Sequence, residues 1–113
     1  MILTILGRIP SKKNSRINTR SGRSFPSSKY TAWHKDASLQ ILKTKKQTQK
    51  GFVLTFYMPD NRRCDLTNKA ESVMDLLVDN DILQDDCWQV TGEIRLVPGG
   101  MDKENPRVEI SYN

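Results

Sequence analysis

The chain has 113 residues, 36% of them hydrophobic and 27% charged, and a formal net charge of +5. This composition excludes a wholly disordered basic tail, and we expect one compact domain over residues 1–113 with a single modest core. The longest apolar runs are far shorter than the roughly 20 residues of a membrane span, and the N-terminus lacks a signal peptide's features. The chain has two cysteines, which form no CxxC pair, and one histidine, so it has few ligands for a zinc site. We therefore expect a cytoplasmic protein with reduced thiols, no membrane contact and no small-molecule cofactor.

The charges are divided unevenly along the chain. Residues 1–50 contain twelve Lys or Arg and one acid, whereas residues 51–113 contain six Lys or Arg and twelve acids. Eight of the acids fall between Asp60 and Val90. Carboxylates held close together repel one another unless a cation lies among them, and hard divalent ions prefer oxygen ligands. The basic half suits an anionic polymer, and the acidic cluster suits a metal ion.

A strand and a long basic loop are expected first. Ile2 to Leu6 is a short apolar run with β-favouring residues, which is typical of a strand. Residues 8–29 contain seven cations, no acid and no periodic pattern. A loop of this length in a compact domain is functional or disordered, so we interpret it as a phosphate-binding arm, with a solvated loop as the alternative. The DNA-binding candidates in this arm are Lys12, Lys13, Asn14, Arg16, Arg20 and Arg23.

A helix is expected from about Lys29 to Lys46, with Ser28 as its cap. Its apolar side is formed at helical spacing by Tyr30, Trp33, Ala37 and Ile41. His34 lies beside this side, where an edge histidine is commoner than a metal ligand. The tail at residues 42–50, LKTKKQTQK, is open to two interpretations: a solvated helix end whose cations the helix dipole favours, or a nucleic-acid contact.

The second half of the chain predicts a strand over residues 52–58, a helix over about 66–80, and strands over 90–97 and 107–112. The order is then β-α-β-α-β-β. It predicts a two-layer α/β (α+β) fold, in which a mixed sheet of about four strands carries two helices on one face.

The helix over residues 66–80 has a buried and a polar side. The buried stripe is expected to contain Leu66, Ala70, Val73, Met74 and Leu77. The opposite side carries Asn68, Glu71 and Asp75 at spacings of three and four. Polar residues there are ordinary for a surface helix, but Glu71 and Asp75 are also like charges that a metal or a basic neighbour would relieve.

These polar residues, in this order, resemble a known family, the RusA-type Holliday-junction resolvases. The resemblance lies in Asp65-Leu66-Thr67-Asn68, then Glu71, Asp75 and Leu77, and about ten residues later Asp85-Asp86. Met58-Pro59-Asp60 at the end of a strand, and Ile9-Pro10-Ser11 with Asn14 near the start, also match. The similarity covers nearly the whole chain in order.

The resemblance implies a small homodimeric endonuclease of the kind often carried by phages and prophages. Such enzymes use Mg²⁺ or Mn²⁺ to nick two strands symmetrically at a four-way DNA junction. By this resemblance the catalytic residues are Asp65, Glu71, Asp75 and Asp86. The implied metal ligands are Asp65, Asp75, Asp85 and Asp86, with Asn68 in a supporting role. Arg62, Arg63 and Lys69 are the candidates for contact with the DNA phosphate.

Two positions depart from the family pattern. Thr67 stands where the family commonly has its second aspartate, and Glu71 stands where it commonly has a lysine. Glu71 restores the carboxylate count, so we interpret the pair as a swap, with a non-catalytic DNA-binding homologue as the alternative. A basic RNA-binding module is a weaker third hypothesis, because the loop holds only Phe25 as an aromatic residue. The two cysteines, Cys64 and Cys87, adjoin proposed ligands and are expected to be buried packing residues.

Overall fold

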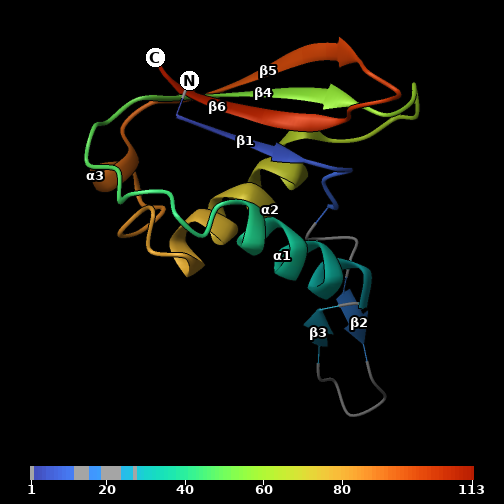
Figure 1. Cartoon of the computed structure of the whole chain (residues 1–113), viewed down its shortest axis with the longest axis horizontal. Coiled ribbons are helices and arrows are strands. Elements are labelled where there is room, and N and C mark those ends of the chain that lie inside the picture. The colour runs from blue at the N-terminus through green and yellow to red at the C-terminus, as the bar shows by residue number, and fades with distance from the viewer. Residues whose placement is uncertain (1, 12–15, 19–23, 27) are drawn as a thin grey trace.

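A computed structural model describes residues 2–11, 16–18, 24–26 and 28–113 (Figure 1). Its elements, in chain order, are β1 (Leu3–Leu6), β2 (Arg16–Asn18), β3 (Ser24–Pro26), α1 (Ser28–Gln40), β4 (Phe52–Met58), α2 (Leu66–Asp79), α3 (Trp88–Thr91), β5 (Ile94–Met101) and β6 (Arg107–Tyr112). Among these described residues, no helix is both long and apolar enough to span a membrane.

The main sheet has the strand order β1-β6-β4-β5. β4 pairs with β5 in parallel, and the β1–β6 and β4–β6 pairs are antiparallel, so the sheet is mixed. Figure 1 shows α1 and α2 together on one side of this sheet, and α3 near the end where β4 and β5 begin. The structure therefore confirms the predicted fold, a two-layer mixture of α and β with a mixed sheet of four strands.

The core lies between the sheet and the two long helices. Alternate residues of β4 and β6 point into it, because successive side chains of a strand face opposite sides of a sheet. The largest fully buried side chains of these two strands are Phe52, Leu54, Phe56, Val108 and Ile110, and those of α2 are Val73, Leu76 and Leu77. Burying each such side chain contributes about 1.5–3 kcal/mol, so this contact fixes α2 against the sheet.

α1 is shorter than expected. The sequence predicted a helix to Lys46, but the helix ends at Gln40. Ile41 is still buried, as its place on the apolar side predicted, but beyond it the Gln47 N–H donates to the Ile82 carbonyl oxygen at 2.7 Å. The Thr44 N–H donates to the Ile41 carbonyl oxygen at 2.9 Å in a turn, and Gln47 bonds Ile82 instead of the preceding residues, so the chain leaves the helix before Lys46.

The region after α2 also differs from the prediction. The strand expected from Val90 begins at Ile94, because the Val90 and Thr91 N–H groups both bond the Cys87 carbonyl oxygen in the short helix α3. Gly92 ends α3 with φ +67°, and a Cβ added there would lie 3.0 Å from Lys50 Cβ. A residue with a side chain is disfavoured in that conformation, so Gly92 sets where β5 begins.

The basic loop holds a third difference, because it contains β2 and β3. These strands pair antiparallel in a small sheet of their own. Figure 1 shows this hairpin projecting away from the main sheet, beyond the first residues of α1. The expectation of a loop without regular structure is therefore wrong at these two strands.

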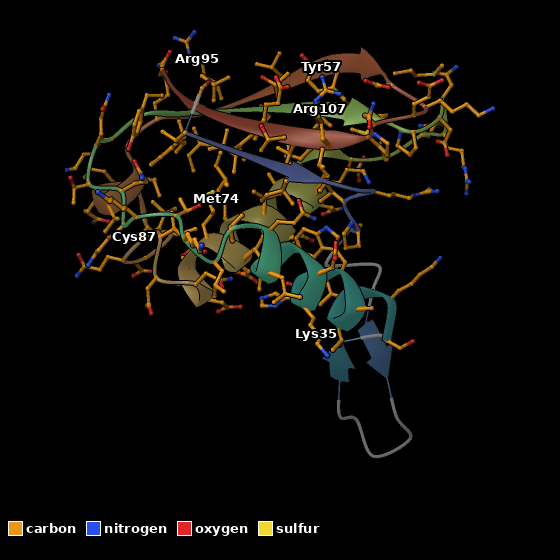
Figure 2. All side chains as sticks on the ribbon, viewed as in Figure 1. Lys35, Tyr57, Met74, Cys87, Arg95 and Arg107 are labelled. Atoms are coloured by element: carbon orange, nitrogen blue, oxygen red, sulfur yellow. The ribbon has the colours of Figure 1, made fainter. Side chains whose placement is uncertain are left out.

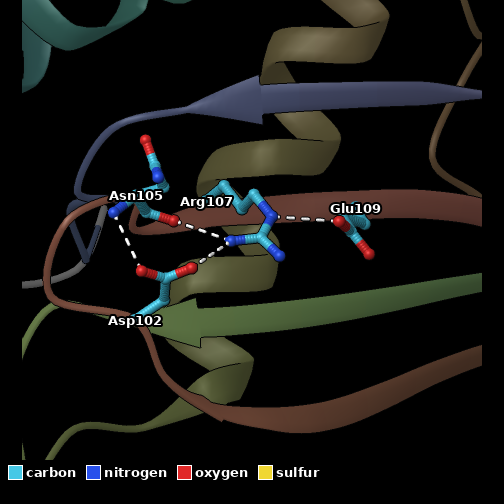
Figure 3. Close-up of polar contacts among 4 residues, drawn as sticks. All are labelled: Asp102, Asn105, Arg107 and Glu109. Carbon is cyan, nitrogen blue, oxygen red and sulfur yellow. Dashed lines mark hydrogen bonds and ion pairs between the residues drawn. The ribbon is translucent and has the colours of Figure 1, made fainter.

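Arg107 joins the β5–β6 turn to the helix-free face of the sheet (Figure 3). Its Nη1 donates to Asp102 Oδ2 at 2.8 Å and to the Asn105 carbonyl oxygen at 2.9 Å, and its Nε donates to Glu109 Oε2 at 2.9 Å. The guanidinium also lies 3.9 Å from the centre of the Tyr57 ring. The Asn105 N–H and then the guanidinium hold the pKa of Asp102 below its usual value of 3.8.

Arg107→Gln should lower the melting temperature at pH 6 by about 5 °C, because it removes both ion pairs and the ring contact. The Asp102 carboxylate stabilises the fold above its unfolded pKa, and this stabilisation is lost as the pH falls through its lower folded pKa. The difference between wild type and variant should therefore narrow below pH 3.8. Thermal melts followed by circular dichroism measure it.

Arg95→Gln is the matched control. Arg95 forms an ion pair with a single carboxylate, that of Glu93, at 2.8 Å, and both side chains are more than half exposed. Such a pair adds little stability. Equal melting temperatures for Arg107→Gln and Arg95→Gln would contradict the role given to Arg107.

Candidate active site

The helix α2 separates the candidate metal ligands, with Asp75 within the helix and the other three outside it. Asp65 directly precedes α2, whereas Asp85 and Asp86 follow it in the loop before α3. A helix of 14 residues is about 21 Å long. Figure 2 places Cys87, the neighbour of Asp86, at the opposite side of the view from the connection between β4 and α2. Among the described residues, no three acidic, histidine or cysteine side chains lie together in a group that could hold a metal.

Asp65 occupies the N-cap position of α2 in an extended conformation, with φ −94° and ψ 118°. Its side chain makes no capping bond to the helix. Instead, Asn68 Nδ2 donates to Asp65 Oδ2 at 3.3 Å. The carboxylate is exposed, and the start of a helix favours negative charge. Asn68 thus orients a carboxylate that stays open to a ligand, and its supporting role in catalysis stays a prediction.

Glu71 and Asp75 lie further along the helix. Glu71 is exposed and Asp75 is half-buried. Glu71 is six residues beyond Asp65, which is about 9 Å along the helix axis. Thr67, also exposed, lies between them. The structure leaves Glu71 free to face a ligand, and the idea that it replaces the carboxylate missing at Thr67 stays a prediction.

A basic pocket adjoins the start of α2. Its inner part has a volume of about 210 Å³ and is lined by Arg8, Arg62, Arg63, Cys64 and Lys69, with Asp60. A larger part of about 510 Å³ shares Arg8, Arg62, Cys64 and Lys69 and continues past Lys29 and Trp33. Five cations therefore surround a space immediately before Asp65. Arg62, Arg63 and Lys69 were predicted from the sequence, whereas Arg8 and Lys29 were not assigned to the site.

Asp60 positions two of these cations. Its carboxylate lies 3.6 Å from Arg8 Nη1 and 3.1 Å from Arg62 Nε, and it accepts the Arg62 backbone N–H at 3.0 Å. That backbone bond is the largest of the causes that lower the pKa of Asp60. One carboxylate among five cations leaves the pocket positive, so it suits a phosphate group.

Lys69 anchors the start of the basic arm. It is only 8% exposed, and its Nζ donates to the Ile9 carbonyl oxygen at 2.5 Å. Ser72, one turn further along α2, donates its hydroxyl to the Pro10 carbonyl oxygen at 2.7 Å. Burial lowers the pKa of Lys69. These two bonds fasten residues 9–10 to α2, so Lys69 holds the arm against the pocket as well as lining it.

The geometry agrees with a comparison against protein families. The family model described as Endodeoxyribonuclease RusA matches residues 7–112, nearly the whole chain. The chain belongs to the RusA endodeoxyribonuclease family. A search of curated proteins found no match. Membership confirms the family suggested by the order of Asp65, Asn68, Asp75 and Asp86, and it identifies the protein as one of a family of DNA-cutting enzymes.

Within this RusA-family chain, the predicted residues of the arm are only partly described. Arg16 lies in β2. Five others, Lys12, Lys13, Asn14, Arg20 and Arg23, lie outside the described residues.

The remaining candidates have clear positions. Cys64 is exposed, so the expectation of a buried packing residue is wrong there, and Cys87 is half-buried. Cys64 is exposed because it belongs to the connection that rims the basic pocket. Trp33 packs against the core, and His34 is an edge histidine whose Nε2 lies 2.9 Å from Asp79 Oδ2.

Lys69→Met should loosen the base of the arm. Methionine keeps much of the apolar stem but cannot donate to the Ile9 carbonyl oxygen, so residues 8–11 should exchange their amide hydrogens about tenfold faster. Glu71→Gln, a change on the exposed side of the same helix, is the control. Hydrogen exchange followed by mass spectrometry measures both variants, and equal protection of residues 8–11 would contradict the anchoring role of Lys69.

Proposed function

We propose that the protein is a Mg²⁺- or Mn²⁺-dependent endonuclease that resolves four-way (Holliday) DNA junctions by paired, symmetric hydrolysis of phosphodiester bonds during recombination and repair. Family membership supports the DNA-cutting activity. The observation that carries the proposal for this chain is the pocket of five cations that is also lined by Cys64, the residue directly before the exposed Asp65. A phosphate bound by these cations is one residue along the chain from a candidate metal ligand.

The donor chemistry fits the metal, but the spacing within one protomer does not. Asp65, Asp75, Asp85 and Asp86 offer only oxygen atoms, which Mg²⁺ and Mn²⁺ prefer. Yet α2 places Asp65 and the Asp85-Asp86 pair at opposite ends, and one described protomer groups no three of them. We therefore propose a homodimer in which the Asp65 end of one protomer meets the Asp85-Asp86 end of its partner.

Two-fold symmetry makes this contact reciprocal. When one Asp65 meets the partner's acid pair, the other Asp65 meets the first protomer's pair, so a dimer has two equal sites. Two equal sites suit a four-way junction, which presents two equivalent strands to be cut. The homodimer and the choice of junction as substrate thus support each other.

The side chains at and near the pocket are proposed to bind the phosphate and to orient the metal ligand. Arg62 and Arg63 bind the oxygens of the phosphate, with Arg8 held beside them by Asp60. Asn68 orients the Asp65 carboxylate. A divalent ion, when bound by the carboxylates, lowers the pKa of a water and stabilises negative charge on the phosphate.

A non-catalytic DNA-binding homologue is the second candidate function. Thr67 and Glu71 favour it, because both depart from the residues common in the family. In that case the protein binds junctions and never cuts them, and Asp65→Asn changes nothing that is measured.

The test is cleavage of a synthetic four-way junction with Mn²⁺. Asp65→Asn and Asp86→Asn should each lower cleavage at least about 100-fold while junction binding persists, because each removes a metal ligand from both sites. Asp81→Asn is the control: Asp81 is an exposed acid between the two groups, and its φ of 59° is one that asparagine tolerates.

Mixing the two inactive variants tests the shared site. A dimer with one Asp65→Asn and one Asp86→Asn protomer has one site with both carboxylates and one with neither. After equal mixing and subunit exchange, about one quarter of the wild-type sites should return, and they should nick single strands rather than pairs. No recovery in the mixture would place the ligands within one protomer, and a wild type that binds without cutting would favour the non-catalytic homologue.

A further inference from the structure

We infer that the protein has a second DNA-binding surface near the Asp85-Asp86 pair, where the lysines of residues 43–50 bind strand phosphates and Trp88 stacks on an unpaired base. Residues 43–50 are called the lysine segment below. The inference rests on the proposed function for its choice of DNA as the polymer, but it concerns residues that the proposed active site does not use.

The lysine segment is not explained by the end of a helix. The helix dipole accounts for cations only within a helix's last turn. α1 ends at Gln40, and its last turn contains no basic residue. The first interpretation of the sequence, a solvated helix end favoured by the dipole, therefore fails. The nucleic-acid interpretation of the same lysines remains.

The segment is irregular but held in place. The Gln47 N–H donates to the Ile82 carbonyl oxygen at 2.7 Å, and the Gln47 side chain accepts a hydrogen bond from the Tyr112 hydroxyl. Just after the segment, the Gly51 N–H donates to the Thr91 carbonyl oxygen at 2.8 Å. These bonds tie its middle to Ile82 and to β6, and the residue after its end to α3. Its lysines are therefore presented from a fixed backbone.

The lysines of the segment are exposed and uncompensated. All four, Lys43, Lys45, Lys46 and Lys50, are exposed. Across the part of the chain that the structure describes, none of them forms an ion pair with a carboxylate. Four like charges within eight residues repel one another, so a polyanion bound across them relieves that repulsion.

A groove lies between the lysine segment and α3. It has a volume of about 200 Å³, and its polar lining includes Lys46 and Lys50 from the segment with Gln84 and Gln89 from the opposite wall. Among the residues that the structure describes, no carboxylate lines it. Ammonium and amide donors on both walls, without a competing acid, suit the oxygens of a phosphodiester rather than a cation or a peptide amine.

Trp88 is an exposed aromatic side chain beside this groove. It is 75% exposed, although tryptophan is a side chain that proteins usually bury. It belongs to α3, one residue before Gln89 of the groove and two residues after Asp86. An exposed indole beside a phosphate-binding groove is typical of surfaces on which bases stack. Trp88 therefore favours a strand with an unstacked base, as at a junction's branch point, over plain duplex.

Binding without cleavage tests this surface, so divalent ions are removed with EDTA. The slope of log affinity against log salt concentration is negative. The double variant Lys46→Gln with Lys50→Gln should reduce its magnitude by about 1 to 2, because two phosphate contacts are lost. The control is Lys35→Gln with Lys103→Gln, which removes the same charge from exposed lysines outside the groove and should leave the slope unchanged. Equal slopes for both double variants would overturn the inference.

The role of Trp88 has its own readout. With Trp33→Phe as background, Trp88 is the only tryptophan. A four-way junction should quench its fluorescence more strongly than linear duplex does. Trp88→Ala should weaken junction binding roughly tenfold and leave duplex binding unchanged. Unchanged fluorescence at saturating junction, or quenching by RNA and not by DNA, would overturn the inference.

The two proposals fail separately. A protein that binds junctions through Lys46, Lys50 and Trp88 yet never cuts them, with or without Mn²⁺, supports the second surface and contradicts the endonuclease. In the opposite case the protein cuts junctions, but both double lysine variants and Trp88→Ala bind them as wild type does. That result supports the endonuclease and contradicts the second surface.

Discussion

The packing of α2 against the sheet is the constraint on which the rest of the structure depends. Val73, Leu76 and Leu77 are fully buried, and truncating one such side chain to alanine typically costs about 2–5 kcal/mol. The helix is therefore held in a fixed position against one face of the sheet. Its 14 residues span about 21 Å, with Asp65 directly before its first residue and the Asp85-Asp86 pair in the loop beyond its last.

Different charged groups lie near the two ends of α2. At the start of α2, the Lys69 and Ser72 bonds to residues 9–10 bring the base of the basic arm to the pocket that contains Arg8, Arg62 and Arg63. Past its other end, the acid pair follows a loop that also holds the lysine segment through Ile82. Cations and carboxylates thus occur together at both ends, which is the arrangement that a reciprocal dimer on a branched polyanion requires.

Much of the fold followed from local patterns. Strict alternation predicted residues 52–58 and 107–112 as strands at the observed bounds of β4 and β6, and helical spacing predicted α2 to within one residue at its end. The prediction failed where tertiary contacts decided. Gln47 bonds Ile82 instead of extending α1, and the conformation of Gly92 delays β5. The Gln47–Ile82 bond has no signal in the neighbouring sequence, whereas Gly92 is a glycine within the predicted strand and could have indicated the break.

The candidate site residues stay a prediction from the motif, and the motif did not predict their arrangement. The order of Asp65, Asn68 and Asp86 was enough to indicate the RusA family. Their separation follows from the helical rise of 14 residues, which is a property of the element between them rather than of the motif. Arg8 and Lys29 were predicted only as cations of the basic arm, because their place in the pocket depends on the packing of β1 and α1 beside the connection from β4 to α2.

The chain's two cysteines allow the most direct test of a site shared between protomers, because Cys64 precedes Asp65 and Cys87 follows Asp86. Cys64→Ser and Cys87→Ser proteins are treated with a short bis-maleimide, separately and after mixing. The shared site predicts that a covalent dimer forms in the mixture through Cys64 of one protomer and Cys87 of the other, and that neither variant alone is linked as well. Absence of this cross-link in a mixture that still cuts junctions would contradict it.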